Sequence, residues 1–272
     1  MSEGVVDAAE GSRLAYEVVG DGRPVLWQHG LGADRAQPAV VFPAMPGVRR
    51  ITLECRGHGR SALGDPARLS IACFAADVLM LLDHLQIERV VVGGISLGAA
   101  IALRIAALHP SRASGLILGR PAWVDGPSPD TLAPYLAVVR LLRAYGADEG
   151  ARRFETSRTR EALDAVSPDN ARSLRAFFTR HTRESTMALL ARIPLDTPGV
   201  SVEMMKRITA PALIVTTGQD YIHPLAYGDR LHALLPNAAL RIVTSKTIDG
   251  DRYVAEFRGA LGAFLTTLET AS

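Results

Sequence analysis

Short runs of apolar residues alternate along this chain with longer segments in which apolar residues recur at helical spacing. Turn residues such as Gly20-Asp21-Gly22 bound the short runs, which is typical of strands. We predict strands at residues 14–19, 24–28, 49–55, 90–93, 115–119, 212–217 and 240–244. We predict helices at residues 70–85, 97–108, 224–235 and 252–268. Strands that alternate with helices in this way indicate an α/β fold with a doubly wound, mostly parallel sheet.

The alternation of strands and helices stops in the middle of the chain. From about residue 120 to residue 207 no strand is predicted, and helical stretches at 132–145, 149–154 and 169–181 are separated by turn residues. A helical block between two strands of one sheet is typical of an inserted lid. We therefore predict a core made of residues 1–119 and 208–272, with a helical lid at 120–207.

One stretch combines a buried strand with a motif that can carry chemistry. The valines that begin at Val90 run into Gly94-Ile95-Ser96-Leu97-Gly98, and an apolar helix follows. A serine at a sharp turn between strand and helix has strained backbone and an exposed hydroxyl, and the flanking glycines are needed where a Cβ would not fit. The helix N-terminus also directs amide groups at negative charge that forms beside the serine. Ser96 is therefore the candidate nucleophile.

Composition limits the other classes of function. The chain has 272 residues, 48% of them hydrophobic, and a net charge of +2, which is too small to indicate nucleic-acid binding. Residues 90–108 are long enough to span a membrane, but their glycines and valines favour a strand followed by a helix. The N-terminus has no secretory signal, and Cys55 and Cys73 form neither a disulfide framework nor a metal-ligand spacing. We expect a cytoplasmic protein that does not bind membranes.

The sequence contains no metal-ligand cluster, no phosphate-binding glycine loop and no dinucleotide fingerprint. We therefore expect no metal and no cofactor, and a small molecule as the substrate. The oligomeric state stays open, with a homodimer as one candidate.

Several motifs in a fixed order resemble those of the α/β-hydrolase fold family over nearly the whole chain. They are His29-Gly30, Arg56-Gly57-His58-Gly59-x-Ser61, the turn at Gly94–Gly98, and Gly218-Gln219-Asp220. The resemblance implies the α/β-hydrolase fold with an inserted helical lid, and an enzyme of the serine-nucleophile type.

The same resemblance implies roles for four residues. Ser96 is the nucleophile, and the backbone amides of Leu97 and Leu31 are the oxyanion donors. Asp220, which follows a predicted strand, is the acid that orients the base. For the side chain of His29 we favour local packing and hydrogen bonding, because the family uses this loop mainly through its backbone.

The base is missing from the position that the resemblance implies. The family's histidine lies in the loop after the last strand, which here reads Thr244-Ser-Lys-Thr-Ile-Asp-Gly-Asp251. The last histidine of the chain is His232, which lies within a predicted helix. The sequence therefore predicts a displaced base or none.

His223 is the preferred candidate for the base. It lies three residues after Asp220 and directly before Pro224, where a helix can begin at the edge of the sheet that carries the site. Lys246 is an alternative if burial lowers its pKa, although an exposed lysine is the simpler interpretation. His181 on the lid is a third candidate, and His58 has a structural interpretation.

Two residues after the strand at 115–119 suggest a preference for acidic substrates. Arg120 can bind a carboxylate or phosphate through its planar fork, and Trp123 can form an aromatic wall beside it. A salt bridge at the lid hinge is the structural alternative for Arg120.

The sequence favours a hydrolase acting on an ester, lactone or related carbonyl compound through Ser96. Two alternatives stay open: a non-hydrolytic relative with lyase-type or cofactor-independent chemistry, and a ligand-binding protein that has lost catalysis.

Overall fold

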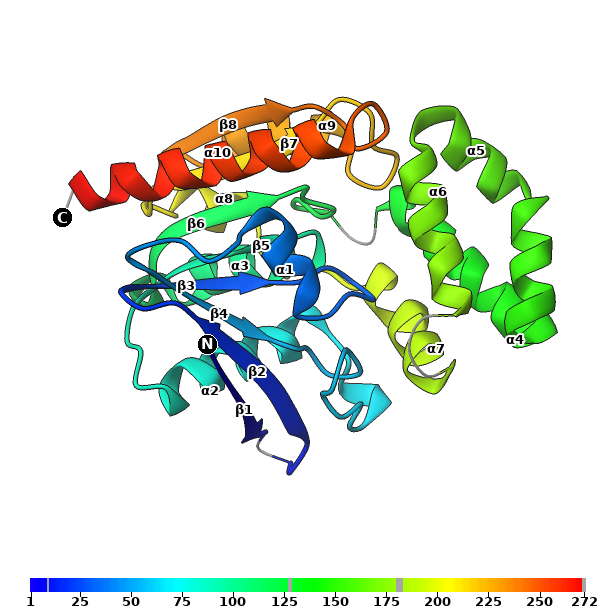
Figure 1. Cartoon of the computed structure of the whole chain (residues 1–272), viewed down its shortest axis with the longest axis horizontal. Coiled ribbons are helices and arrows are strands. Elements are labelled where there is room, and N and C mark those ends of the chain that lie inside the picture. Colours follow the sequence, from blue (N-terminus) through cyan, green and yellow to red (C-terminus); the bar gives the residue numbers. More distant parts are fainter. Residues whose placement is uncertain (9, 127–128, 180–182, 271–272) are drawn as a thin grey trace.

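One sheet organises the protein in the computed structural model, which describes residues 1–8, 10–126, 129–179 and 183–270 (Figure 1). Its eight strands lie in the order β1-β2-β4-β3-β5-β6-β7-β8. The strands are β1 (Ser2–Asp7), β2 (Arg13–Val19), β3 (Arg23–Gln28), β4 (Val48–Leu53), β5 (Val90–Ile95), β6 (Ala113–Gly119), β7 (Ala212–Thr217) and β8 (Ala238–Val243). β2 pairs antiparallel with β1 and β4, and the other pairs are parallel. The predicted doubly wound, mostly parallel sheet is confirmed.

The sequence did not predict β1, the first strand at the edge of the sheet. Most of its side chains are exposed, and Val6 is buried. A strand that buries so little apolar surface has a weak hydrophobic pattern, so its pairing with β2 decides its conformation.

Both faces of the sheet are buried, and β5 shows this most clearly. Val90 and Val92 belong to one apolar cluster, whereas Val91 between them belongs to the cluster on the opposite face. Side chains alternate between the faces of a strand, so a strand covered on both sides is a continuous apolar run. This arrangement explains why the stretch after Val90 resembles a membrane segment in sequence.

Helices cover the two faces. The helices are α1 (Ala36–Val41), α2 (Ile71–His84), α3 (Leu97–Leu108), α4 (Ala133–Glu155), α5 (Arg158–Val166), α6 (Pro168–Arg175), α7 (Arg183–Arg192), α8 (Val202–Lys206), α9 (Leu225–Leu234) and α10 (Gly250–Thr270). α1 and α10 pack against each other and contribute to the cluster that contains Val91. α2, α3, α8 and α9 contribute to the other cluster. The sheet is therefore the middle of three layers.

The segment between β6 and β7 is helical, as predicted, and α4 to α7 stand together beside one end of the sheet (Figure 1). The two predicted helices at 132–145 and 149–154 are the two halves of α4, which is broken at Gly146 with φ of 76°. α8 packs on α3 and α9 of the core, although the predicted lid extends to residue 207. The predicted division into core and lid stays a prediction.

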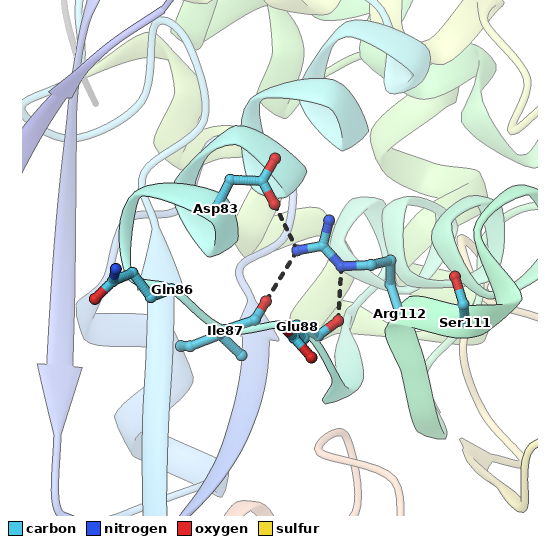
Figure 2. A pocket seen from close by; sticks show the side chains of 6 residues that line it. All are labelled: Asp83, Gln86, Ile87, Glu88, Ser111 and Arg112. Atoms are coloured by element: carbon cyan, nitrogen blue, oxygen red, sulfur yellow. Dashed lines mark hydrogen bonds and ion pairs between the residues drawn. The ribbon is translucent and has the colours of Figure 1, made fainter.

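Arg112 links the chain segments that line a surface hollow between the end of α2 and the start of β6 (Figure 2). The Arg112 guanidinium donates to the carbonyls of Glu88 at 2.8 Å and Ile87 at 2.9 Å. It also pairs with Asp83 at 2.8 Å. Arg112 therefore joins two chain segments that lead into neighbouring strands.

Among the described helices, none combines the length and the apolar character that crossing a membrane requires.

Candidate active site

Ser96 lies in the turn between β5 and α3, with φ of 56° and ψ of −108°. Left-handed backbone of this kind is uncommon for a residue with a side chain. The two glycines of the motif make room for it, because a Cβ on Gly98 would lie 2.3 Å from the carbonyl oxygen of Gln28. A Cβ on Gly94 would lie 2.7 Å from the same oxygen. The turn therefore forms as the motif predicts, and the Ser96 amide is fixed by donating to the Gly119 carbonyl at 2.9 Å.

Three side chains predicted from the sequence meet at this turn. The Ser96 hydroxyl donates to Nε2 of His223 over 2.9 Å. Nδ1 of His223 donates to Oδ1 of Asp220, also over 2.9 Å. The three residues are all less than 10% exposed. This is the relay of hydroxyl, imidazole and carboxylate that acyl transfer by a serine requires.

The base and the acid of this relay come from one short turn. Asp220 and His223 lie in the connection between β7 and α9, and the His223 amide donates to Oδ1 of Asp220 at 3.1 Å. The same carboxylate oxygen therefore holds both the backbone and the imidazole of His223. A separation of three residues makes this double contact possible without any other part of the chain.

Two backbone amides near Ser96 are candidates for an oxyanion hole: Leu97 follows it in the chain, and Leu31 lines the same cavity. Leu97 is the first residue of α3, where an amide has no partner within the helix. In the loop after β3, the Gly30 amide donates to Gln37 at 2.7 Å and the Gly32 amide donates to His58 at 3.0 Å. The amide of Leu31 between them has no partner among the described residues. These are the two donors predicted from the sequence.

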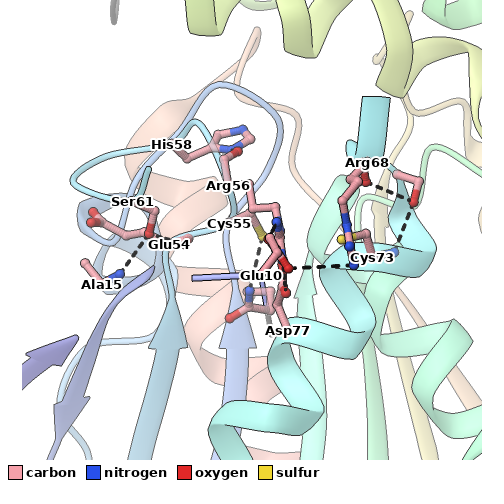
Figure 3. Close-up of polar contacts among 12 residues, drawn as sticks. Glu10, Ala15, Glu54, Cys55, Arg56, His58, Ser61, Arg68, Cys73 and Asp77 are labelled. Carbon is pink, nitrogen blue, oxygen red and sulfur yellow. Dashed lines mark hydrogen bonds and ion pairs between the residues drawn. The ribbon is translucent and has the colours of Figure 1, made fainter. Parts of the chain in front are cut away.

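Side chains of the motif from Arg56 to Ser61 make polar contacts with the surrounding chain (Figure 3). Through His58 the motif also contacts the loop after β3. Arg56 is buried and pairs with both carboxylate oxygens of Asp77 at 2.7 Å, and it also contacts Glu10. Ser61 accepts from the Ala15 amide at 2.9 Å and donates to the Glu54 carbonyl at 2.6 Å. His58 accepts from the Gly32 amide, in agreement with its structural interpretation.

His29 is also used locally, as predicted. Its Nε2 accepts from the Cys55 amide at 3.0 Å, and its Nδ1 donates to the Gly30 carbonyl at 2.9 Å. The local interpretation of this side chain is confirmed. His181, the lid candidate for the base, lies outside the described residues.

Arg120 contacts Asp220, in contrast to the predicted fork for a substrate anion. Its guanidinium donates to Oδ2 of Asp220 from Nε at 2.7 Å and lies 2.5 Å away through a second nitrogen. A carboxylate of Asp169 lies 3.7 Å away. Two donors of the fork are thus used within the protein, although Arg120 also lines the cavity at Ser96, and the predicted contact with a substrate anion stays a prediction. The structural alternative, a salt bridge, is what the structure contains.

This pair sets the charge of the site. Burial alone would raise the pKa of Asp220, but the charges of Arg120 and His223 outweigh it and hold the pKa well below its usual range. Burial lowers the pKa of His223, and Arg120 lowers it further against the opposing effect of Asp220. At neutral pH the site therefore contains a carboxylate beside a neutral imidazole, which can accept a proton.

Lys246 has the lowered pKa that a base would need, but it lies away from the cavity at Ser96. Burial, helped by the charge of Arg120, lowers its pKa to about 8. Its ammonium lies 4.8 Å from the ring centre of Tyr253, and Lys246 is not among the residues that line the cavity at Ser96.

The cavity at Ser96 is small, about 80 Å³. Its lining combines apolar and polar side chains from the strand ends and from the helical segment between β6 and β7: Gly30, Leu31, Gln37, Ile95, Ser96, Arg120, Tyr135, Asn170, Ser173, Leu174, Phe177, Ile222 and His223. Trp123, predicted as an aromatic wall, is instead buried, and its Nε1 donates to the Asp196 carbonyl at 2.9 Å. Tyr135 and Phe177 supply aromatic rings to the lining, and the sequence carried no signal that distinguishes them from core residues. No group of three metal-binding side chains is found in the described part of the chain.

Comparisons with known proteins agree with this architecture. A sequence model of the family described as alpha/beta hydrolase fold matches residues 23–247. The chain is 39% identical over 119 residues to the dihydrolipoyllysine-residue acetyltransferase component of the acetoin cleaving system from Pseudomonas putida. This match covers 41% of the chain and 31% of that protein, and two further relatives are covered over only 43% and 38% of their lengths.

A longer match is to "Putative carbamate hydrolase RutD" from Pseudomonas syringae pv. syringae (strain B728a). The two are 30% identical over 222 residues, which cover 78% of this chain and 81% of that protein. The solved structure of the enol-lactonase from Burkholderia xenovorans LB400 is similar with a TM-score of 0.74 and 22% identity, over 97% of this chain and 100% of that one. At this identity the likeness shows the fold alone. The family model covers most of the chain, and the chain therefore belongs to the α/β-hydrolase fold family.

Proposed function

We propose that this protein is a serine hydrolase that cleaves a small ester, lactone or related carbonyl compound. The observation that carries the proposal is the continuous line of hydrogen bonds from Asp220 through His223 to Ser96. It supports a displaced base, in which His223 replaces the histidine that the family keeps after the last strand.

The proposed reaction has two steps, in which Ser96 is first acylated and the acyl group is then hydrolysed. Ser96, His223 and the two backbone amides take part in both steps. His223 Nε2 takes the proton of the Ser96 hydroxyl as Oγ bonds to the substrate carbonyl carbon. The negative charge on the carbonyl oxygen is stabilised by the amides of Leu31 and Leu97. His223 then gives the proton to the leaving alcohol, and an acyl group stays on Ser96. Water, deprotonated by His223, releases the acid product and restores the serine.

The cavity supports a substrate with a short acyl group. About 80 Å³ beside Ser96 is little space, and the rings of Tyr135 and Phe177 are part of its lining. Because Arg120 is paired with Asp220, we assign no substrate anion to it, and the preference for acidic substrates is not part of the proposal. The name of the longer-matching relative, "Putative carbamate hydrolase RutD", agrees with chemistry at a carbonyl group.

Labelling with a serine-directed fluorophosphonate tests the proposal. We expect one adduct, located on Ser96 by mass spectrometry of peptides, and no adduct in Ser96→Ala. Ser61→Ala is unsuitable as a control because Ser61 holds two backbone groups. Ser201→Ala, which alters a helix cap far along the chain, should label like the wild type.

Hydrolysis of p-nitrophenyl esters of increasing chain length then tests the substrate class. Acetate and butyrate esters should react, and the rate should fall steeply for octanoate. A folded wild-type protein that does not label would contradict the proposed function and favour a non-hydrolytic or ligand-binding role.

A further inference from the structure

The turn that carries His223 has almost no backbone hydrogen bonds of its own. The successive amides of Tyr221, Ile222 and His223 all donate to side chains. Their acceptors are Ser167 Oγ at 3.0 Å, Asn170 Oδ1 at 3.0 Å and Asp220 Oδ1 at 3.1 Å. A buried amide without a partner is costly, so these acceptors fix the path of the turn.

Two of these three acceptors belong to the inserted helices. Ser167 and Asn170 lie at the start of α6, more than 50 positions before the amides that they hold. Both are almost completely buried. The backbone in front of the imidazole is thus held from outside the core.

Ser167 is the N-cap residue of α6, but its hydroxyl does not cap the helix. It is the residue before the first turn of α6, where a serine hydroxyl normally accepts from an amide of its own helix. Ser157 does so for α5, where its Oγ accepts from the Arg160 amide at 3.1 Å. Ser167 makes no such cap, and its hydroxyl accepts from Tyr221. α6 therefore lacks this cap, and the hydroxyl holds the turn that carries His223.

Asp169, between these two residues, extends the contacts to the neighbouring strand ends. Its Oδ1 accepts from the Thr247 hydroxyl at 2.7 Å in the loop after β8. Its Oδ2 lies 3.7 Å from the Arg120 guanidinium after β6. The start of α6 thus contacts the ends of β6, β7 and β8.

We infer that Ser167 and Asn170 are positioning residues for His223, so that the inserted helix α6 is part of the catalytic framework. The inference rests on the proposed function, because it assigns the base to His223. In the family arrangement that the sequence departs from, the base follows the last strand. Here it lies in a turn whose amides are held by the insertion. Movement of α6 away from the sheet breaks these two hydrogen bonds and releases the imidazole from Ser96.

Ser167→Ala is the sharpest variant, because Ser167 is absent from the cavity lining and its loss leaves the substrate contacts in place. We expect amide exchange at Tyr221, followed by mass spectrometry or NMR, to become about tenfold faster, the equivalent of one hydrogen bond. We expect the maximal rate of Ser96 labelling to fall about tenfold, with little change in the reagent concentration that gives half of that rate. Asn170→Ala should act in the same way on Ile222.

Ser157→Ala is the matched control, since Ser157 is also a serine at the start of an inserted helix whose hydroxyl accepts from a backbone amide, here that of Arg160 in its own helix. It should leave exchange at 221–223 and Ser96 labelling within twofold of the wild type. Ser167→Thr, which keeps the hydroxyl, should restore much of the labelling rate. If Ser167→Ala does not fold, Asn170→Ala is measured by exchange at Ile222 and by the ring nitrogen shifts of His223, because Asn170 also lines the cavity and its loss can alter labelling directly.

Unchanged exchange and unchanged labelling in folded Ser167→Ala and Asn170→Ala would overturn the inference. Faster exchange with unchanged labelling would also overturn it, because the turn would then be held by α6 without any effect on the base. If wild-type Ser96 does not label, the proposed function fails, and the position of the His223 imidazole, read from its ring nitrogen shifts in wild type and Ser167→Ala, decides the inference.

Discussion

Two loops at neighbouring strand ends differ in the side chains that they bring to Ser96. The loop after β8, where the family keeps its histidine, contains Ser245, Lys246 and Thr247, and these residues contact the protein itself. The turn after β7 contains Asp220 and also His223, which reaches Ser96. The geometry of a relay depends on where the imidazole lies in space, whichever loop carries it. Strand ends that meet at one sheet edge offer more than one way to bring it there.

The proposed position of the base in the turn after β7 has a structural consequence. A base in the loop after β8 would be independent of the backbone that carries the acid. With both groups in one turn of four residues, any disturbance of that turn moves the acid and the base together. The turn is accordingly held by side chains from three directions: Arg120 after β6, the start of α6, and Ser245 after β8.

The largest expected effect comes from removing the imidazole. His223→Ala should slow Ser96 labelling and ester hydrolysis by about 10⁴-fold, because no other group then takes the serine proton. His232→Ala, which removes an exposed histidine of α9, should leave both rates unchanged. Equal labelling in His223→Ala and the wild type would show that the turn after β7 has not taken over the base.

Arg120→Met should have the next largest effect, because it leaves the buried carboxylate of Asp220 without its partner. We expect the free energy of unfolding, measured with urea, to fall by about 3–5 kcal/mol. Arg140→Met, at an exposed position of α4, should change it by less than about 0.5 kcal/mol.

The same variant should move the pH dependence in a defined direction. The rate rises as the imidazole loses its proton, so the acid limb of the profile follows the pKa of His223. That pKa is lowered by burial and by the charge of Arg120, so the wild-type midpoint should lie below 6.5. Without Arg120 the pKa of His223 rises, and the limb should move to higher pH. A limb that moves to lower pH would contradict this account of the site.

The sequence could predict those parts of the site that depend on local structure. The turn at Ser96 follows from two glycines at fixed spacing, and the approach of His223 to Asp220 follows from a separation of three residues. The pairing of Arg120 with Asp220 joins positions 100 residues apart and depends on β6 and β7 being neighbours. The contact of Ser167 with the Tyr221 amide could not be predicted for another reason: a serine before Pro168 indicates an ordinary helix cap. Trp123 had no pattern that distinguished a pocket wall from a buried donor.

Ser245→Ala should have a smaller effect and tests the support that one loop gives to the other. The Ser245 hydroxyl donates to the Gln219 carbonyl at 2.7 Å, directly before Asp220. Its loss should lower the free energy of unfolding by about 0.5–1.5 kcal/mol, the net contribution of one hydrogen bond, because Gln219 is exposed and water can replace the donor. It should slow Ser96 labelling by less than about tenfold. Ser201→Ala, which removes an exposed helix-capping hydroxyl, is the control for labelling.

Lys246→Met should have the smallest effect on the reaction and is the most direct test of which loop holds the base. Lys246 lies over the ring of Tyr253, so Ser96 labelling should change by less than about twofold. Its lowered pKa can be measured separately, because the chain has two lysines, Lys206 and Lys246. After reductive methylation with ¹³C-formaldehyde, NMR should show one lysine that titrates near pH 8, absent in Lys246→Met. If Lys246→Met removed most of the labelling while His223→Ala did not, the loop after β8 would have kept the base and only changed its side chain.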